Sequence, residues 1–156
     1  MRVNQEAQAN QASNAVLALN SIELNGTATD KAGAIKEAGD LLVASGNVDP
    51  SYVDSMYERE RSVSTYMGNL LAIPHGTNEA KTLIKQSCIS LVRYANGITW
   101  NGNPVKFVVG IAGAGDDHLD LLGQIAVVFM DEEGIGKLEA ATTAEQIMDV
   151  FSDVEL

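Results

Sequence analysis

The stretch Leu71-Ala72-Ile73-Pro74-His75-Gly76-Thr77-Asn78-Glu79-Ala80-Lys81 organises the rest of the chain. A short apolar run ends at Pro74, which has no N–H to continue a strand ladder. His75 follows at once, and then come Gly76 and a Thr-Asn-Glu segment that can open a short helix. The pattern predicts a strand that delivers one imidazole to an exposed loop. Only two of the 156 residues are histidine, so the position of each deserves scrutiny.

The composition indicates one compact domain with an acidic surface. A chain of 156 residues that is 46% hydrophobic is long and apolar enough to bury a core. The formal net charge of -11 argues against nucleic acid as a partner, because phosphate backbones select basic surfaces. Such a charge would attract and steer a basic protein partner, but taken by itself it is better explained by solubility alone. Residues 1–13 are polar and we expect a mobile leader there, with a single domain over residues 14–156.

The chain shows neither a membrane segment nor a secretory signal. No apolar run approaches the roughly 18 residues that suggest a membrane span. The polar N-terminus also lacks the apolar core of a signal peptide. We therefore expect a cytoplasmic protein with no direct membrane insertion.

Strand and helix signals alternate through the chain, which predicts an α/β layered structure. Strands are expected at residues 21–24, 70–73, 87–93 and 105–112. The last of these is the most apolar and should be central. Asn96-Gly97 is a tight-turn signal, so we expect the chain to reverse there and a returning strand to begin at Ile98. Helices are expected from Thr29 or Asp30 to Gly46, after Asp49-Pro50, from Asp116 or Asp117, and at 135–140 and 143–151.

Both histidines follow predicted strands. His75 comes just after residues 70–73, and His118 follows residues 105–112 and a short glycine-rich loop. In open α/β sheets, sites gather outside the carboxyl ends of the strands. If these two strands are neighbours in the sheet, the two imidazoles converge.

Three kinds of site would use such a pair. The first is phosphoryl transfer through a phosphohistidine, since a neutral imidazole is a good nucleophile near pH 7 and a second donor or an arginine can hold the phosphate oxygens. The second is a metal site, although no HxxxH or CxxC spacing supports it. The third is nucleotide binding at Gly110–Gly115, but close packing at a strand end explains those glycines better. The candidate metal ligands are His75, His118, Asp116 and Asp117.

Beyond these patterns, the residues resemble a known family. The segments 66–68, 71–77 and 79–81 are similar to the active-site block of the enzyme IIA components of the bacterial sugar phosphotransferase system, in the mannitol/fructose superfamily. The form Pro-His-Gly-Thr-x-Glu-Ala-Lys is closest to the mannitol-type branch. Glu58-Arg59-Glu60 resembles the end of a helix in that branch. By charge alone, the quartet 58–61 would be a solvated helix end. The resemblance extends from about residue 29 to residue 151.

The resemblance implies a single-domain mixed β-sheet flanked by helices, acting as a phosphotransferase component without cofactor or metal. His75 would take phosphate from HPr, His118 would stabilise it, and Arg59 would contact it. The phosphate would then pass to a cysteine of enzyme IIB, for uptake and phosphorylation of mannitol or a related sugar. The alternative is a regulatory protein in which the phosphorylation state of His75 controls binding to other proteins. Cys88 lies in a predicted strand and is interpreted as a buried structural thiol.

Two further expectations concern the space around the phosphate. Two adjacent carboxylates precede His118, and they would repel phosphate unless they point away from it or cap the following helix. Gly76 is expected to leave room beside the imidazole for a phosphate and a docking partner. The carboxylates belong to Asp116 and Asp117.

Overall fold

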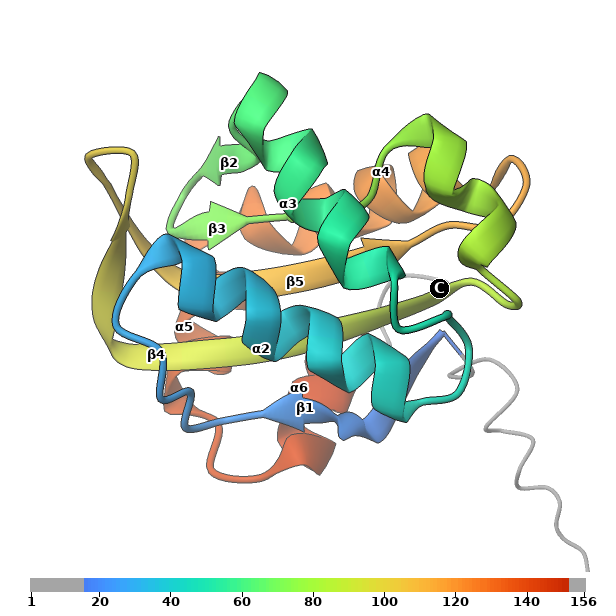
Figure 1. The fold of residues 1–156 in the computed structure, drawn as a ribbon. Helices are drawn as coiled ribbons and strands as arrows, with labels where there is room; N and C mark the ends of the chain where they lie inside the picture. Colours follow the sequence, from blue (N-terminus) through green and yellow to red (C-terminus); the bar gives the residue numbers. More distant parts are fainter. Residues whose placement is uncertain (1–15, 152–156) are drawn as a thin grey trace, which may run out of the picture.

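The structure, a computed structural model, describes residues 16–151 (Figure 1). The predicted leader, residues 1–13, lies outside the described residues. The elements in chain order are β1 (Leu17–Glu23), α2 (Lys31–Ala44), α3 (Tyr52–Ser62), β2 (Tyr66–Gly68), β3 (Leu71–Ala72), the 3-10 helix η1 (Asn78–Leu83), β4 (Cys88–Trp100), β5 (Asn103–Ala112), α4 (Asp117–Phe129), α5 (Glu132–Ala140) and α6 (Ala144–Phe151).

A five-stranded mixed sheet forms the centre, in the order β1-β4-β5-β3-β2. The long strands β4 and β5 are antiparallel, whereas β1 runs parallel to β4 and β3 runs parallel to β5. The predicted α/β class and the central position of residues 105–112 are confirmed. Figure 1 shows α2 and α3 across one face of the sheet and α4, α5 and α6 behind it.

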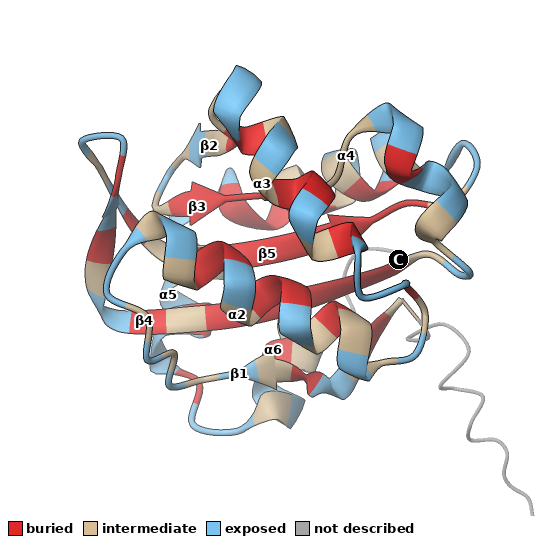
Figure 2. Cartoon of the chain, viewed as in Figure 1, coloured by how far each residue is buried: buried red, intermediate tan, exposed pale blue. Residues whose placement is uncertain are grey.

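The two faces of the sheet carry two separate apolar clusters, because successive side chains of a strand point in opposite directions. Helices α2 and α3 cover the cluster that includes Val92 and Val108. Helices α4, α5 and α6 cover the cluster that includes Leu91 and Val109. Figure 2 shows buried residues along β4 and β5 for this reason. None of the helices within residues 16–151 is both long and apolar enough to cross a membrane.

Local hydrogen bonds from aspartate side chains mark where the two front helices begin. The carboxylate of Asp30 accepts a hydrogen bond of 2.9 Å from the Gly33 N–H, which confirms the predicted start of α2. Before α3, the Asp49 carboxylate accepts from the N–H of Ser51 at 3.0 Å. The helix then starts at Tyr52 and directs two cavity-lining residues, Tyr52 and Arg59, toward the carboxyl edge of the sheet.

The turn predicted at Asn96-Gly97 is wrong. Strand β4 continues through that pair to Trp100, and its register with β5 shifts between Arg93 and Ile98. The chain reverses at Asn101-Gly102 instead, where both residues have positive φ, 53° and 87°. A two-residue hairpin turn of this type requires positive φ at both central positions, whereas only the glycine of the first pair has it.

The structure contains an edge strand between α3 and β3 that the sequence patterns did not predict. Strand β2 (Tyr66–Gly68) pairs antiparallel with β3. Asn69 and Leu70, with φ of 55° and 70°, turn the chain between the two strands. The hydrogen-bonded strand expected at 70–73 is therefore shorter, and β3 comprises Leu71 and Ala72.

Candidate active site

The two histidines meet at the carboxyl edge of two parallel neighbouring strands, β3 and β5. Pairing between them continues past β3 as an isolated bridge between His75 and Ile111, and the Ile111 N–H donates to the Pro74 carbonyl at 3.0 Å. His118 lies in the first turn of α4, after the end of β5. The ring centroids of His75 and His118 are 4.7 Å apart and the rings are tilted by 54°. The two loops thus bring the imidazoles together as their positions after the strands predicted.

The imidazole of His75 is held in one orientation. Its side chain is largely buried, and its Nδ1 lies 2.8 Å from the carbonyl oxygen of Ile73. A carbonyl only accepts hydrogen bonds, so Nδ1 carries the proton and Nε2 keeps its lone pair. Burial lowers the pKa of His75 from its usual value, with a further lowering by the charge of Arg59. The ring is therefore a neutral nucleophile near pH 7.

His118 is also uncharged near neutral pH. Burial lowers its pKa to about 4, and His75 and the positive charges of Lys81 and Arg59 act in the same direction. The end of β5 approaches the backbone of His118 closely. A Cβ on Gly113 would lie 2.6 Å from the Cα of His118, so the packing has no room for a larger residue there.

Neither of the two carboxylates before His118 lines the cavity that holds the imidazoles. The Ser87 hydroxyl donates to Asp117 Oδ2 at 2.5 Å and accepts from the Ala114 N–H at 2.8 Å. Asp116 occupies the N-cap position of α4, but its side chain makes no capping hydrogen bond. Asp117 is thus bonded to Ser87 outside the cavity, which matches the expectation that it points away from the phosphate site.

A cavity of about 260 Å³ surrounds the two imidazoles and carries two cations. The Arg59 guanidinium is anchored by a 2.8 Å hydrogen bond to the carbonyl of Val63, and Lys81 Nζ donates to the carbonyl of Gly115 at 3.1 Å. Lys81 belongs to the stretch of residues 71–81, although no role was predicted for it. The lining residues are Tyr52, Arg59, His75, Gly76, Thr77, Asn78, Glu79, Lys81, Ile84, Gly113 and His118.

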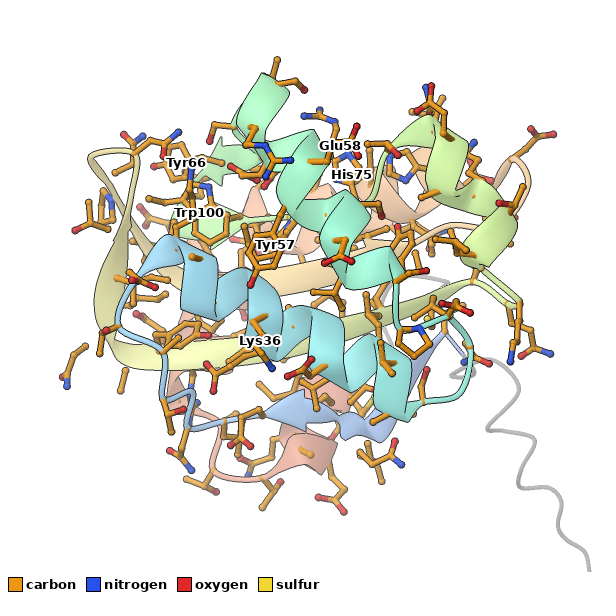
Figure 3. All side chains as sticks on the ribbon, in the orientation of Figure 1. Lys36, Tyr57, Glu58, Tyr66, His75 and Trp100 are labelled. Carbon is orange, nitrogen blue, oxygen red and sulfur yellow. The ribbon has the colours of Figure 1, made fainter. Side chains whose placement is uncertain are left out.

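The charged quartet at the end of α3 is not a uniformly solvated face. Glu60 is only 5% exposed, and its carboxylate accepts from the N–H and the hydroxyl of Thr65 and from the indole N–H of Trp100 at 2.9 Å. These bonds anchor the last turn of α3, so that the neighbouring Arg59 lines the cavity. Glu58 is exposed, as charge alone predicts, and Figure 3 labels it close to His75.

Sequence reasoning also missed Tyr52. Its hydroxyl donates to the Ile111 carbonyl at 2.9 Å and accepts from the Gly76 N–H at 2.9 Å. Burial raises its pKa to about 12, so the hydroxyl stays protonated. A Cβ on Gly76 would lie 2.5 Å from Ser55 Oγ and 2.6 Å from Tyr52 Cε1, so these two side chains, and not a phosphate, take the space that the glycine leaves. The available signal was spacing, because Tyr52 and Arg59 are seven residues apart and share one helix face.

The other interpretations of these residues find less support. Within residues 16–151, no group of three or more His, Cys, Asp or Glu side chains is placed to hold a metal ion. A Cβ on Gly110 would lie 2.7 Å from Ser90 Oγ, which supports the close-packing account of that glycine over nucleotide binding. Cys88 is buried, and burial raises its pKa to about 11, as expected of a structural thiol.

Comparisons with known proteins identify the family of the chain. Residues 15–154 match the family described as phosphoenolpyruvate-dependent sugar phosphotransferase system, EIIA 2. The chain is 43% identical over 142 residues to the mannitol-specific phosphotransferase enzyme IIA component of Halalkalibacterium halodurans, covering 91% of this chain and 98% of the relative. The corresponding protein of Bacillus subtilis is 44% identical over 140 residues, covering 89% and 98%.

Two solved structures from Escherichia coli share the fold. The crystal structure of IIA mannitol has a TM-score of 0.80 and 30% identity, covering 86% of this chain and 98% of that one. The complex of enzyme IIAMTL with phosphorylated enzyme IIBMTL has a TM-score of 0.82 and 29% identity, covering 88% and 97%. The chain therefore belongs to the EIIA 2 family of the phosphoenolpyruvate-dependent sugar phosphotransferase system, and it is a phosphotransferase component.

Proposed function

We propose that this chain is a cytoplasmic phosphocarrier of the mannitol type, which accepts a phosphoryl group from phospho-HPr on His75 and passes it to a cysteine of enzyme IIB. One observation carries the proposal. The Nδ1 of His75 is bonded to the Ile73 carbonyl, which leaves Nε2 as a neutral nucleophile in a cavity that His118 and Arg59 also line. The assignment of mannitol as the sugar and of enzyme IIB as the acceptor is supported by the names of the relatives and of the Escherichia coli complex.

In the first step, the lone pair of His75 Nε2 attacks phosphorus. The new N–P bond forms as the bond to the histidine of HPr breaks, and that electron pair returns to the donor imidazole. The proton on Nδ1 of His75 remains on its hydrogen bond to Ile73, so the phosphorylated ring is cationic. A cationic ring is the better leaving group when the enzyme IIB thiolate attacks, forms the S–P bond and returns the electron pair to Nε2.

The surrounding residues supply position and charge. A ring N–H of neutral His118 and the guanidinium of Arg59 would donate hydrogen bonds to the phosphoryl oxygens. Such transfer needs little covalent chemistry beyond the nucleophile, so alignment and electrostatic stabilisation carry most of the catalysis. Lys81 lines the same cavity and would add a second positive charge.

The test is a two-stage transfer. Phospho-HPr should label the chain, and addition of a mannitol-type enzyme IIB should remove the label and place it on a cysteine. His118→Ala and Arg59→Gln should slow the transfer. A chain that takes no phosphate from phospho-HPr would contradict the proposal. Label that enters but never moves to enzyme IIB would point to the regulatory alternative.

A further inference from the structure

Three hydrogen-bonded contacts fix the backbone and ring around His75. The imidazole Nδ1 donates to Ile73, and the N–H of Ile111 donates to Pro74, one residue before the histidine. The third contact runs through a side chain, because the Tyr52 hydroxyl joins the N–H of Gly76 to the carbonyl of Ile111. The peptide after His75 therefore depends on a residue of α3 for its attachment to β5.

The third contact joins the two backbone groups that face each other in the bridge between His75 and Ile111. In a parallel pair, the N–H of the residue after His75 would donate directly to the carbonyl of Ile111. Here the Tyr52 hydroxyl is bonded to both of those groups, at 2.9 Å from each, so a side chain of α3 takes part in holding the chain that follows β3 against β5. The ring of Tyr52 is buried beneath Gly76, where a Cβ would lie 2.6 Å from Tyr52 Cε1.

We propose that Tyr52 is a positioning residue for the phosphoryl transfer: its hydroxyl spaces the His75 loop from β5 and so keeps Nε2 of His75 directed into the cavity. The proposal rests on the proposed function of His75 as phosphoryl acceptor. Without the hydroxyl, the Gly76 N–H and the Ile111 carbonyl would be left without their shared partner. They would close toward each other, because unpaired polar groups in a buried position are costly. The peptide carrying His75 would move with them.

Movement of that peptide has two measurable consequences. The bond from Nδ1 to Ile73 would weaken, so the proton would distribute between both ring nitrogens of His75 and the Nε2 lone pair would be lost in part. The ring would also lose its alignment, and a misplacement of about 1 Å can cost roughly 100-fold in rate. We expect Tyr52→Phe to slow phosphorylation of His75 by about 10-fold to 100-fold, including at saturating phospho-HPr.

The chain offers a matched control on the same helix. Tyr57 also donates its hydroxyl to a backbone carbonyl, that of Ala32 in α2, at 2.9 Å, and it does not line the cavity. Figure 3 labels Tyr57 and His75 on the same view. Tyr57→Phe removes a hydrogen bond of the same kind, so its effect measures what a purely structural tyrosine contributes.

The experiment compares the wild-type chain with Tyr52→Phe and Tyr57→Phe. Nitrogen-15 NMR of the imidazole gives the fraction of His75 protonated at Nδ1, and rapid-quench assays with phospho-HPr give the transfer rate. We expect a predominantly Nδ1-protonated ring in the wild type and in Tyr57→Phe, and a mixture in Tyr52→Phe. Tyr57→Phe should transfer within about twofold of wild type. A wild-type tautomer and rate in folded Tyr52→Phe would overturn the proposal.

A second variant approaches the same contact from the other side. Gly76→Ala places a methyl group 2.5 Å from Ser55 Oγ and 2.6 Å from Tyr52 Cε1, so the loop and the Tyr52 ring must separate, and we expect the hydroxyl contact to be lost. It should show the same mixed tautomer, and it decides the matter if Tyr52→Phe does not fold. The NMR comparison needs no phosphate donor. If phospho-HPr fails to label even the wild type, the proposed function fails while the tautomer result still settles whether Tyr52 orients His75.

Discussion

Replacing Glu60 with alanine should cost the protein a large part of its stability, although the residue lies in a charged quartet at a helix end. The substitution removes the acceptor for the Thr65 N–H and for the indole N–H of Trp100, both of which are buried. Each donor left unpaired costs about 1 to 3 kcal/mol, which gives about 4 kcal/mol for the two. Lys31 adds little, because its ammonium is 3.9 Å from the carboxylate and 32% exposed, so water can solvate it.

The assay is urea unfolding near pH 7, followed by far-UV circular dichroism and by the emission of Trp100, the single tryptophan of the chain. The matched control is Glu58→Ala, an exposed position two residues earlier in α3, which should change the free energy of unfolding by less than about 0.5 kcal/mol. A Glu60→Ala variant within about 1 kcal/mol of wild type would refute the reasoning, because it would mean that the buried donors find other partners at little cost.

Three further predictions follow from the site. The folded-state pKa of His118 is about 4 against an ordinary 6.5, so between these two pH values the unfolded chain binds a proton that the folded chain does not bind. The free energy of unfolding should therefore be unaffected by His118 above about pH 6.5 and should fall as the pH drops toward 4. In His118→Gln, urea unfolding should show a smaller fall over the same pH range. Arg59→Gln should slow single-turnover phosphorylation by roughly 100-fold, whereas Arg61→Gln, an exposed control on the same helix, should not. Ser87→Ala should slow single-turnover phosphorylation by releasing the Asp117 carboxylate toward the phosphate. Adding Asp117→Asn to that variant should restore the rate. An unchanged rate in Ser87→Ala would show that the hydroxyl does not restrain Asp117.

The main architecture could be predicted because apolar periodicity reports it directly. The run 105–112 was recognisable as the central strand, since a strand buried on both faces is apolar throughout. Strand β2 could not be seen, because three residues are too few to show alternation. The turn at Asn96-Gly97 was mistaken because two Asn-Gly pairs lie close together, and the choice between them depends on backbone angles that the dipeptide alone does not specify.

The meeting of His75 and His118 was also predictable, since it required only that two strand ends be neighbours. The surroundings of the pair were not. The burial of Glu60 depends on Trp100, 40 residues away, and charge pattern alone makes such a carboxylate look solvated. No role was predicted for Tyr52, because its hydroxyl gains one only once α3 is placed over the end of β5.

The central claim is that Nε2 of His75 carries the phosphoryl group. The most direct measurement is to incubate the nitrogen-15-labelled chain with phospho-HPr and to identify the phosphorylated nitrogen by NMR, with His75→Ala alongside. The account predicts one acid-labile, base-stable phosphoryl group on Nε2 of His75, with the Nδ1 proton retained, and no label on His75→Ala. Label on His118, on Nδ1 of His75, or on the His75→Ala variant would contradict it.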